Sequence, residues 1–386
     1  MHYLLIKVHE ICENSTRVQN SQVNIQIGDD TIYEMSYVAP QSDIDAYGED
    51  IDVVPTSMRQ NQVIELRFMD ISAEFKMQLE EIKGNDFRVF EQAGLGGRYR
   101  VCLEVFSDEF IDCSDENRYD MGKDMWKVIG HRGFGANKLM PTTAFQVEEN
   151  TALSISSAFR FGIRAVEVDV QRLIDGSLVL YHDEDLSVHG VHIPLCALDQ
   201  QQFLTLSREF NKSEIPIIED RAITLSSALM LITSDRGINI ELKMYREKRP
   251  EPRLREMYEY CRSVHQQVVN SKTLNVIFSS FDITLCILMQ LVQAAFPVFF
   301  IIPEFGTSYE KVEKCLYKHK LRGVVMTANQ ALYFGENLKR IKRMGVYCFT
   351  YQQPESIKLV TKQFEYGVDG VIIDDPRRYQ WLLPSP

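Results

Sequence analysis

The stretch that decides the fold is residues 128–185, VIGHRGFGANKLMPTTAFQVEENTALSISSAFRFGIRAVEVDVQRLIDGSLVLYHDED. It alternates short apolar runs, typical of buried strands, with polar and charged residues. His131 and Arg132 directly follow the run at 128–130, and His182 ends the run at 178–182. Because the ends of parallel barrel strands meet at one mouth, we expect these side chains to lie close together. The pattern favours metal-assisted chemistry on a phosphoester.

Three carboxylates lie where a cation would be needed. Glu167 and Asp169 are two residues apart in AVEVDV (165–170), so they project from one face of a strand. Glu241 lies near the end of a second apolar run, GINIELKM (237–244). Like charges on one face repel unless a cation lies between them, and Mg²⁺ and Ca²⁺ prefer oxygen ligands. The sequence predicts a site for Mg²⁺ or Ca²⁺; a solvated strand face is the alternative for each motif alone.

Two histidines and an arginine supply the other groups that phosphoester chemistry requires. His131 and His182 can exchange protons near neutral pH. Arg132 offers a planar fork of donors that suits phosphate oxygens. Taken singly, the tripeptide HRG also fits a surface His–Arg pair in a loop.

Lys243 and Glu149 complete the candidate set. Lys243 shares a strand face with Glu241, which suits either phosphate binding or an ordinary surface ion pair. Glu149 precedes a helix-like run at 152–159, where Asn150 or Thr151 would be an ordinary N-cap. The further expectation is that Glu149 points into the site.

Seven short motifs occur in the order found in the glycerophosphodiester phosphodiesterase family. They are HRG at 131–133, ENT at 149–151, E-x-D at 167–169, HD at 182–183, E-x-K at 241–243, FSSF at 278–281 and DGVIID at 369–374. Over about 127–383 the chain resembles that family, and within it the eukaryotic intracellular glycerophosphocholine phosphodiesterases. Each motif is weak alone, whereas seven in order are specific.

The resemblance implies a TIM-like barrel that hydrolyses a glycerol–phosphate–alcohol diester to glycerol 3-phosphate and the free alcohol. Its small-molecule substrate would be a glycerophosphodiester, glycerophosphocholine in particular. The roles that the resemblance implies are Glu167, Asp169 and Glu241 for the divalent ion, His131 and His182 for acid–base catalysis, Arg132 and Lys243 for the phosphate, and Glu149 as a further site carboxylate.

Two features depart from the family pattern. A long segment at 136–147 separates HRG from ENT, and FTYQ at 349–352 stands where many members place a Trp-containing strand. Recognition of the leaving alcohol can therefore differ. Choline would suit an aromatic wall through cation–π contact, and Tyr245, Phe281 and Tyr351 follow barrel strands. Packing at the barrel mouth explains these aromatics equally well.

Composition limits the class of protein. The chain has 386 residues, 45% of them hydrophobic and 25% charged, as is ordinary for a globular protein. No run of about 20 apolar residues predicts a membrane span, and the N-terminus does not read as a signal peptide. Eight cysteines without a CxxC pair fit reduced thiols, so we expect a cytoplasmic protein.

Charge divides the chain unevenly. Residues 1–127 contain 12 Lys and Arg against 25 Asp and Glu, a net charge of −13, and the remainder contains 30 against 29. Neither part has the basic footprint of a nucleic-acid binder, so no nucleic-acid partner is expected. Strand-like runs within 1–120 predict a small β-rich acidic accessory domain. Its partner is unknown, and its lack of tryptophan argues against carbohydrate binding.

Residues 121–386 alternate strand-like and helix-like runs, which predicts an α/β fold, an irregular TIM-like (β/α)8 barrel after the N-terminal domain. Nine candidate strands compete for eight places: 128–131, 165–170, 178–182, 238–243, 275–279, 298–302, 323–326, 346–350 and 370–373. The second and third are too close for a parallel crossover, so either a helix is missing or a hairpin occurs. A small insertion around 184–220 is expected to cap the pocket, followed by a helix at 224–232.

Alternatives remain for the reaction and for the class of protein. The glycerol 2-hydroxyl can attack phosphorus to give a cyclic phosphate, or water can attack directly. A lysophospholipase D-type enzyme on the same barrel would need an apolar surface, for which the run at 288–300 is a candidate, although a buried helix and strand explain it more simply. A non-catalytic scaffold or binding barrel would lack one of the five metal or acid–base residues, and all five are present.

Overall fold

A computed structural model gives the fold. It describes strand segments between His2 and Glu109, Met121, and residues 125–138, 145–188, 190–207, 217–244, 254–304, 309–333 and 335–383. The chain divides into two compact units, residues 1–115 with 248–259, and residues 116–247 with 260–386. Within the described residues, no helix has both the length and the apolar character needed to cross a membrane.

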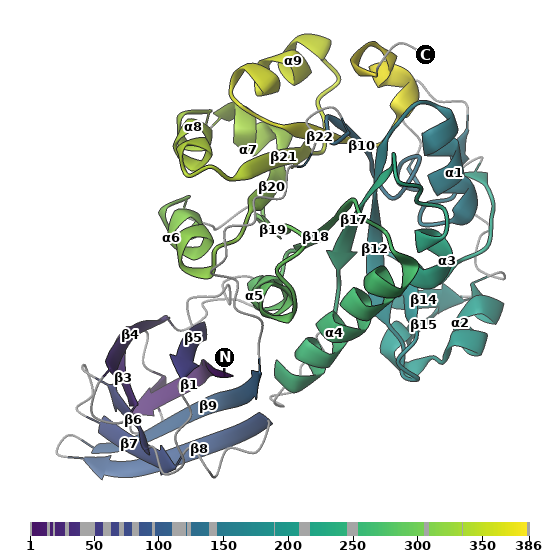
Figure 1. The fold of residues 1–386 in the computed structure, drawn as a ribbon. Helices are drawn as coiled ribbons and strands as arrows, with labels where there is room; N and C mark the ends of the chain where they lie inside the picture. Colours follow the sequence, from purple (N-terminus) through teal and green to yellow (C-terminus); the bar gives the residue numbers. More distant parts are fainter. Residues whose placement is uncertain are drawn as a thin grey trace. The chain divides into compact units, whose positions relative to one another are not determined.

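Eight parallel strands of the second unit form a closed barrel, as predicted (Figure 1). They are β10 (Val128–Gly130), β12 (Ala165–Arg172), β17 (Gly237–Leu242), β18 (Val276–Ser280), β19 (Val298–Ile301), β20 (Gly323–Thr327), β21 (Tyr347–Tyr351) and β22 (Gly370–Ile373). The ring closes because β10 pairs in parallel with both β12 and β22.

The ninth candidate strand is the second arm of a hairpin. β13 (Leu178–Leu180) pairs antiparallel with the end of β12, with Arg172 opposite Leu178 and Val170 opposite Leu180. The turn between them contains Gly176 in the left-handed region, with φ of 84°. Of the two alternatives for this irregularity, the hairpin is the one that forms.

The segment from β13 to β17 builds a subdomain of its own. It contains the hairpin β14 (Asp185–Val188) and β15 (Val191–Pro194), then η2 (Leu195–Ala197), α2 (Gln200–Leu206), β16 (Ile217–Ile218) and α3 (Leu225–Leu229). A small core of buried residues, among them Leu186, Leu195 and Phe203, packs with Val179 of β13. β16 also pairs with β11 (Gln146–Val147).

The helix expected at 224–232 is shorter than predicted. Thr224 is its N-cap, accepting from Ser227 N–H, and the helix ends at Leu229. The amides of Leu231 and Ile232 donate to carbonyls three residues back, at 3.0 and 3.1 Å, so the chain leaves the helix through tight turns.

The remaining helices lie outside the ring of strands (Figure 1). They are α1 (Ala152–Arg160), α4 (Leu254–Ser271), α5 (Ile283–Val292), α6 (Tyr309–His319), α7 (Ala328–Tyr333), α8 (Gly335–Arg343), α9 (Ile357–Glu365) and the 3₁₀ segment η3 (Pro376–Leu382). Most of the apolar run at 288–300 belongs to α5 and β19, and every residue of both elements is buried. The residues between them include the exposed Ala294 and Ala295. The helix and strand parts of the run are therefore core and not a surface for acyl chains.

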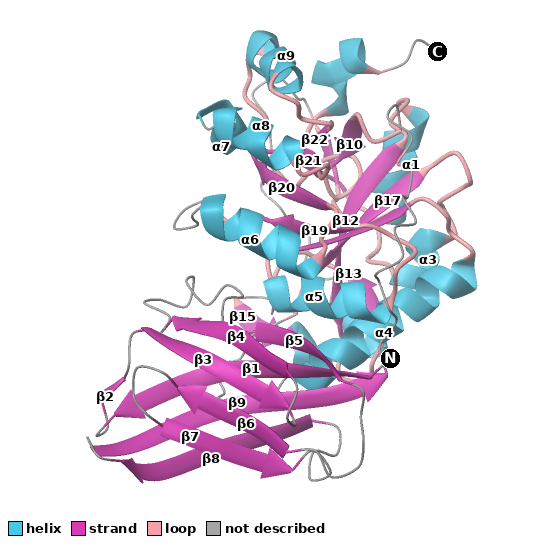
Figure 2. Cartoon of the chain, turned by 60° about the vertical axis from the view of Figure 1, so that its left-hand side comes forward, coloured by secondary structure: helices cyan, strands magenta, loops and turns pink. Residues whose placement is uncertain are grey.

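The first unit contains nine antiparallel strands between His2 and Glu109 (Figure 2). One sheet has the order β2 (Thr16–Arg17), β1 (His2–Glu13), β9 (Gly97–Glu109) and β8 (Asn85–Gly94), with β5 (Ile51–Thr56) also paired to β1. The other has the order β4 (Thr31–Val38), β3 (Asn20–Ile27), β6 (Val63–Phe68) and β7 (Ala73–Gln78).

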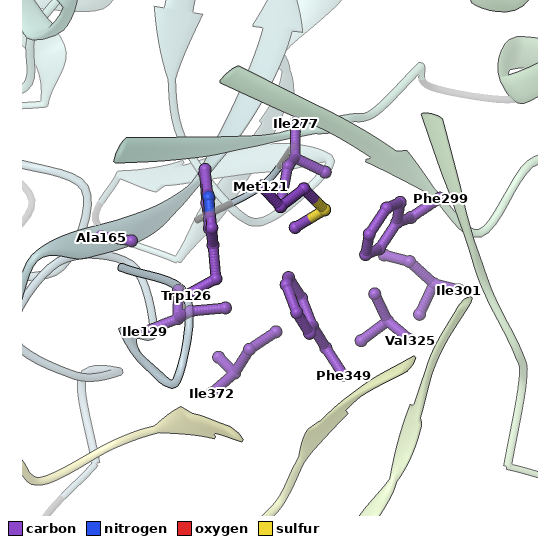
Figure 3. Packing of buried hydrophobic residues seen from close by; sticks show 10 residues of the cluster. All are labelled: Met121, Trp126, Ile129, Ala165, Ile277, Phe299, Ile301, Val325, Phe349 and Ile372. Carbon is purple, nitrogen blue, oxygen red and sulfur yellow. The ribbon is translucent and has the colours of Figure 1, made fainter. Parts of the chain in front are cut away.

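An aromatic core fills the barrel at the beginnings of its strands (Figure 3). The Trp126 ring stacks on Phe349 at 6.3 Å between centroids, and Phe349 contacts Phe299 at 5.0 Å. Three barrel strands, β17, β20 and β22, begin with glycine because there is no room for a side chain at these positions. A Cβ on Gly237 would lie 2.9 Å from the Trp126 ring, and one on Gly370 would lie 2.1 Å from the Trp126 carbonyl oxygen. The opposite ends of the strands are left for polar residues.

Replacing Trp126 with Ala should destabilise the barrel by about 3–5 kcal/mol, because a side chain only 2% exposed would leave a cavity. Denaturant unfolding followed by circular dichroism measures the change. Trp381, which is 44% exposed and is the only other tryptophan of the chain, provides the matched control. Equal, small effects of Trp126→Ala and Trp381→Ala would contradict the packing described here.

Candidate active site

The HRG motif forms a sharp turn at the end of β10. Arg132 has φ of 50° and Gly133 φ of 96°, both in the left-handed region. A Cβ on Gly133 would lie 2.5 Å from Ser154 Oγ, so only glycine fits. Ser154, in the first turn of α1, donates to the Arg132 carbonyl at 3.0 Å and accepts from Phe134 N–H at 2.7 Å. The helix therefore fixes the direction in which His131 and Arg132 point.

Glu167, Asp169 and Glu241 converge as the sequence predicted. One carboxylate oxygen from each lies within 4.8 Å of the others, and the residues are 2%, 1% and 8% exposed. Strand register brings them together, because Asp169 on β12 lies directly opposite Glu241 on β17. Burial and the Asp169 charge raise the pKa of Glu167 to about 8, and burial also raises the pKa of Glu241. The protein's own groups therefore compensate only part of the negative charge of these three carboxylates.

The chemistry of this donor set fits a hard divalent cation. Glu167 Oε2 accepts from the Arg132 amide at 2.9 Å, whereas Glu167 Oε1 is buried without a hydrogen-bond partner among the described residues. A buried carboxylate oxygen without a partner is costly unless a cation takes it up. All three donors are carboxylates, the ligand type that favours Mg²⁺ or Ca²⁺ over zinc.

Lys243 and Arg132 border the same carboxylates. Lys243 Nζ lies 3.0 Å from Asp169 Oδ1 and 3.3 Å from Glu241 Oε1, and Arg132 Nε lies 3.5 Å from Asp169 Oδ2. Although burial acts in the opposite direction, these two cations hold the pKa of Asp169 well below its usual range. The structure thus places both predicted phosphate-binding residues beside the acidic cluster.

The ENT motif connects to this cluster through its first two residues. Glu149 Oε1 accepts from Arg132 Nη1 at 2.8 Å, and its Oε2 accepts from Asn137 N–H at 2.6 Å. Asn150 Nδ2 donates to Asp169 Oδ2 at 2.8 Å and its Oδ1 accepts from Asp169 N–H at 3.1 Å. Thr151 is the N-cap of α1, which leaves Asn150 for the site.

His131 is held by a carboxylate from the last strand. Its Nδ1 lies 2.6 Å from Asp374 Oδ1, just after β22, while its Nε2 lies 3.9 Å from Glu167 Oε2. Burial alone would lower the pKa of His131, but the charges of Asp374 and Glu167 outweigh it and raise that pKa to about 9. In return, although burial opposes it, His131 lowers the pKa of Asp374 to about 2.

His182 approaches from the hairpin. It follows β13, and the adjacent Tyr181 amide donates to the Asp169 carbonyl at 3.1 Å. Its Nδ1 lies 2.7 Å from Asp183 Oδ1. The charge of His182 lowers the pKa of both Asp169 and Glu241, although burial acts in the opposite direction on each. Both histidines therefore have one ring nitrogen bonded to a carboxylate.

Of the three aromatic residues predicted as a wall for choline, the structure describes two. Phe281 follows β18 and Tyr351 ends β21; their rings meet edge to face at 6.4 Å and pack against the barrel core. Burial, followed by the charges of Glu241 and Glu304, raises the pKa of Tyr351 to about 12. Tyr245 lies outside the described residues.

Beside this cluster lies a pocket of about 360 Å³. Arg132 and Asn150 line the pocket and contact Asp169 of the cluster, and Glu149 lines it and binds Arg132. None of the three clustered carboxylates lines the pocket. Glu148 and Tyr181 form part of its wall. Ser207, at the end of α2, also lines it, so the subdomain between β13 and β17 contributes to this pocket.

Sequence reasoning gave no role to Asp374, Asn150 or Asp183. Asp374 ends an apolar strand in the same way as His131 does, and that position was the signal that could have identified it. Asn150 was treated as one of two possible helix caps, and Asp183 as the neighbour of His182.

The comparisons with known proteins agree with this geometry. The sequence profile of the Glycerophosphoryl diester phosphodiesterase family matches residues 131–378. The chain belongs to this family. It is therefore an enzyme of the phosphodiesterase class, built on the barrel that its motifs predicted.

Similar proteins include plant, fungal and animal members of the family. A glycerophosphodiester phosphodiesterase of Arabidopsis thaliana is 29% identical over 64% of this chain and 75% of its own length. A glycerophosphocholine phosphodiesterase of Eremothecium gossypii is 27% identical over 64% of this chain but only 25% of its own length. The human glycerophosphocholine phosphodiesterase is 23% identical over 67% of this chain and 44% of its own length.

Solved structures share the fold. A glycerophosphodiester phosphodiesterase from Parabacteroides distasonis covers 68% of this chain and 98% of its own, with a TM-score of 0.53 and 21% identity. The match to a phosphodiesterase from Oleispira antarctica, in complex with the product sn-glycerol-3-phosphate, covers 66% of this chain and 96% of that one. Its TM-score is 0.53 and its sequence identity is 21%.

Proposed function

We propose that this enzyme hydrolyses glycerophosphocholine to glycerol 3-phosphate and choline, with a divalent cation held by Glu167, Asp169 and Glu241. The observation that supports the proposal is the convergence of these carboxylates with two carboxylate-bound histidines, Arg132 and Lys243 at the ends of the barrel strands. Two relatives, from Eremothecium gossypii and human, are named as glycerophosphocholine phosphodiesterases. Buried free thiols at Cys261, Cys286 and Cys348 suit a reducing cytoplasm.

The bound cation would supply a positive charge that polarises a phosphate oxygen and lowers the pKa of a coordinated hydroxyl. Arg132 and Lys243 neutralise charge that grows on the phosphoryl oxygens as the phosphorus–alcohol bond breaks. One of His131 and His182 accepts the proton of the attacking hydroxyl, and the other donates a proton to the leaving alcohol oxygen as its bond to phosphorus breaks. If water attacks, this step completes the hydrolysis. If the glycerol 2-hydroxyl attacks, the step gives a cyclic phosphate and the free alcohol, and water then opens the ring to glycerol 3-phosphate.

Two substrates separate this proposal from a lysophospholipase D-type activity. Purified protein with Mg²⁺ or Ca²⁺ should release choline from glycerophosphocholine at least 10-fold faster than from lysophosphatidylcholine, because the helix and strand parts of the apolar run at 288–300 are buried and offer no acyl-chain surface. Coupled choline detection measures both rates. Faster release from lysophosphatidylcholine would favour the rival activity, and release from neither would refute the proposal.

The pair of His131 and Asp374 gives a pH-dependent prediction. A carboxylate stabilises the protonated imidazolium, so Asp374→Asn should lower the pKa of His131 from about 9 and move its titration to lower pH. We also expect kcat to fall by roughly 10²-fold, since the imidazole loses the partner that orients it. NMR titration of the metal-free protein follows the pKa. An unchanged His131 titration would contradict this role for Asp374.

A further inference from the structure

The pocket beside Arg132 has a wall that the hydrolytic cluster does not use. Glu148 lies on this wall and is only 9% exposed. Its Oε2 accepts from Asp220 N–H at 2.8 Å. Burial and the charges of Glu219, Asp220 and Glu149 raise the pKa of Glu148 to about 7, although the Asp220 hydrogen bond opposes the rise. A largely buried carboxylate in the wall of a cavity favours a cationic ligand.

An aromatic face lies on the same wall. Tyr181 lines the pocket and is held from behind by Phe203 of α2, edge to face at 5.8 Å. Burial and nearby carboxylates, Asp183 and Glu149 first among them, raise the pKa of Tyr181, so this phenol stays neutral. A neutral, immobilised ring beside a carboxylate is the combination that attracts organic ammonium groups through cation–π contact.

The ion pairs of the charged side chains around the pocket leave a place for a cationic ligand. Arg132 lines it but is neutralised by Glu149 at 2.8 Å and by Asp169 at 3.5 Å. Lys138 also lines the pocket, at an exposed position. Against these stand Glu148, Glu149 and Asp183, of which Glu149 is paired with Arg132 and Asp183 with the His182 imidazole at 2.7 Å. Glu148 is therefore the carboxylate of the pocket that has no cationic side-chain partner among the described residues.

The position of this pocket beside Arg132 relates it to the leaving alcohol of the substrate. A phosphate held by Arg132 and Lys243 would lie beside the clustered carboxylates, and the pocket is lined by Arg132 but by none of those carboxylates. We propose that this pocket is the subsite for a cationic leaving alcohol, with Tyr181 facing its ammonium group and Glu148 as its counter-ion. This inference rests on the proposed function and adds the residues that select the alcohol. It also moves the aromatic contact from the predicted Phe281 and Tyr351 to Tyr181.

Two diesters that differ in the charge of the alcohol test the subsite. Glu148→Gln and Tyr181→Leu should each lower kcat/KM for glycerophosphocholine by about 10-fold, within the range that cation–π and charge contacts provide, and change it less than about 2-fold for glycerophosphoglycerol, whose leaving alcohol is neutral. Glu184→Gln, at an exposed neighbouring carboxylate that does not line the pocket, is the matched control. Equal losses on both diesters, or no loss on glycerophosphocholine, would overturn the subsite.

Choline binding to the His131→Ala protein gives a readout that does not depend on turnover. Ligand-observed NMR should detect choline with His131→Ala alone and roughly 10-fold weaker binding when Glu148→Gln is added. If the wild-type enzyme hydrolyses neither diester but this difference persists, the proposed function fails and the subsite stands. If choline binds both proteins equally, or neither, the subsite is refuted whatever the activity.

Discussion

Replacing Glu241 with Gln should lower kcat/KM for glycerophosphocholine by roughly 10³-fold, because a cation bound by three carboxylates contributes several kcal/mol to the transition state. Glu241 lies opposite Asp169 in the strand register and is 8% exposed, so no solvent molecule can easily replace its oxygen. The amide of Gln retains shape and one acceptor but removes the negative charge. Loss of charge, and not loss of packing, is therefore the change being tested.

Stability measurements separate that effect from misfolding. Without added metal, Glu241→Gln should unfold at the same temperature as the wild type or higher, since one of three buried like charges is removed. The wild type should gain thermal stability on addition of Ca²⁺ or Mg²⁺, and the variant should gain much less. Glu310→Gln, at a surface carboxylate 69% exposed on α6, is the control. Wild-type activity in Glu241→Gln would remove this residue from the proposed metal site.

Either His131→Ala or His182→Ala should reduce kcat by roughly 10²–10⁴-fold with little change in folding. The two imidazoles reach the cluster from β10 and from the β12–β13 hairpin, and each has its Nδ1 bonded to a carboxylate. That bond leaves Nε2 for the reaction and fixes the direction of the ring. Rates and circular dichroism spectra of the purified variants measure the two effects.

The matched control for the histidines lies on the β14–β15 hairpin. His192 is 66% exposed and pairs with Asp185 at 3.1 Å, outside both the cluster and the pocket. His192→Ala should retain the wild-type rate. If His131→Ala or His182→Ala also retains it, the acid–base assignment of that histidine is wrong.

Much of the barrel could be predicted because its signals are local. The two-residue period of AVEVDV places Glu167 and Asp169 on one strand face. The short gap between the runs at 165–170 and 178–182 excludes a parallel crossover there, so an irregularity in the barrel was expected. The choice of a hairpin could not be made from sequence, because a missing helix would have given the same spacing. The length of the helix at 225–229 was overestimated, since the apolar pattern continues into turns at 231–232.

The parts of the site that escaped prediction depend on contacts between distant segments. Asp374 meets His131 across 243 residues, and neither sequence neighbourhood reveals the pairing. Asn150 could have capped α1 equally well, and only its two hydrogen bonds to Asp169 separate it from Thr151. Sequence spacing indicated the contact of Lys243 with Glu241, but not its contact with Asp169 on another strand.

Phosphorus NMR of the purified protein with glycerophosphocholine, after chelation and after metal is added back, tests the central claim most directly. Because Glu167, Asp169 and Glu241 form a buried acidic cluster whose charge the protein only partly compensates, we expect no glycerol 3-phosphate in the presence of chelator. Addition of Ca²⁺ or Mg²⁺ should restore its formation in the wild type and not in Glu241→Gln. Full turnover of the diester by the chelated wild type would contradict the account.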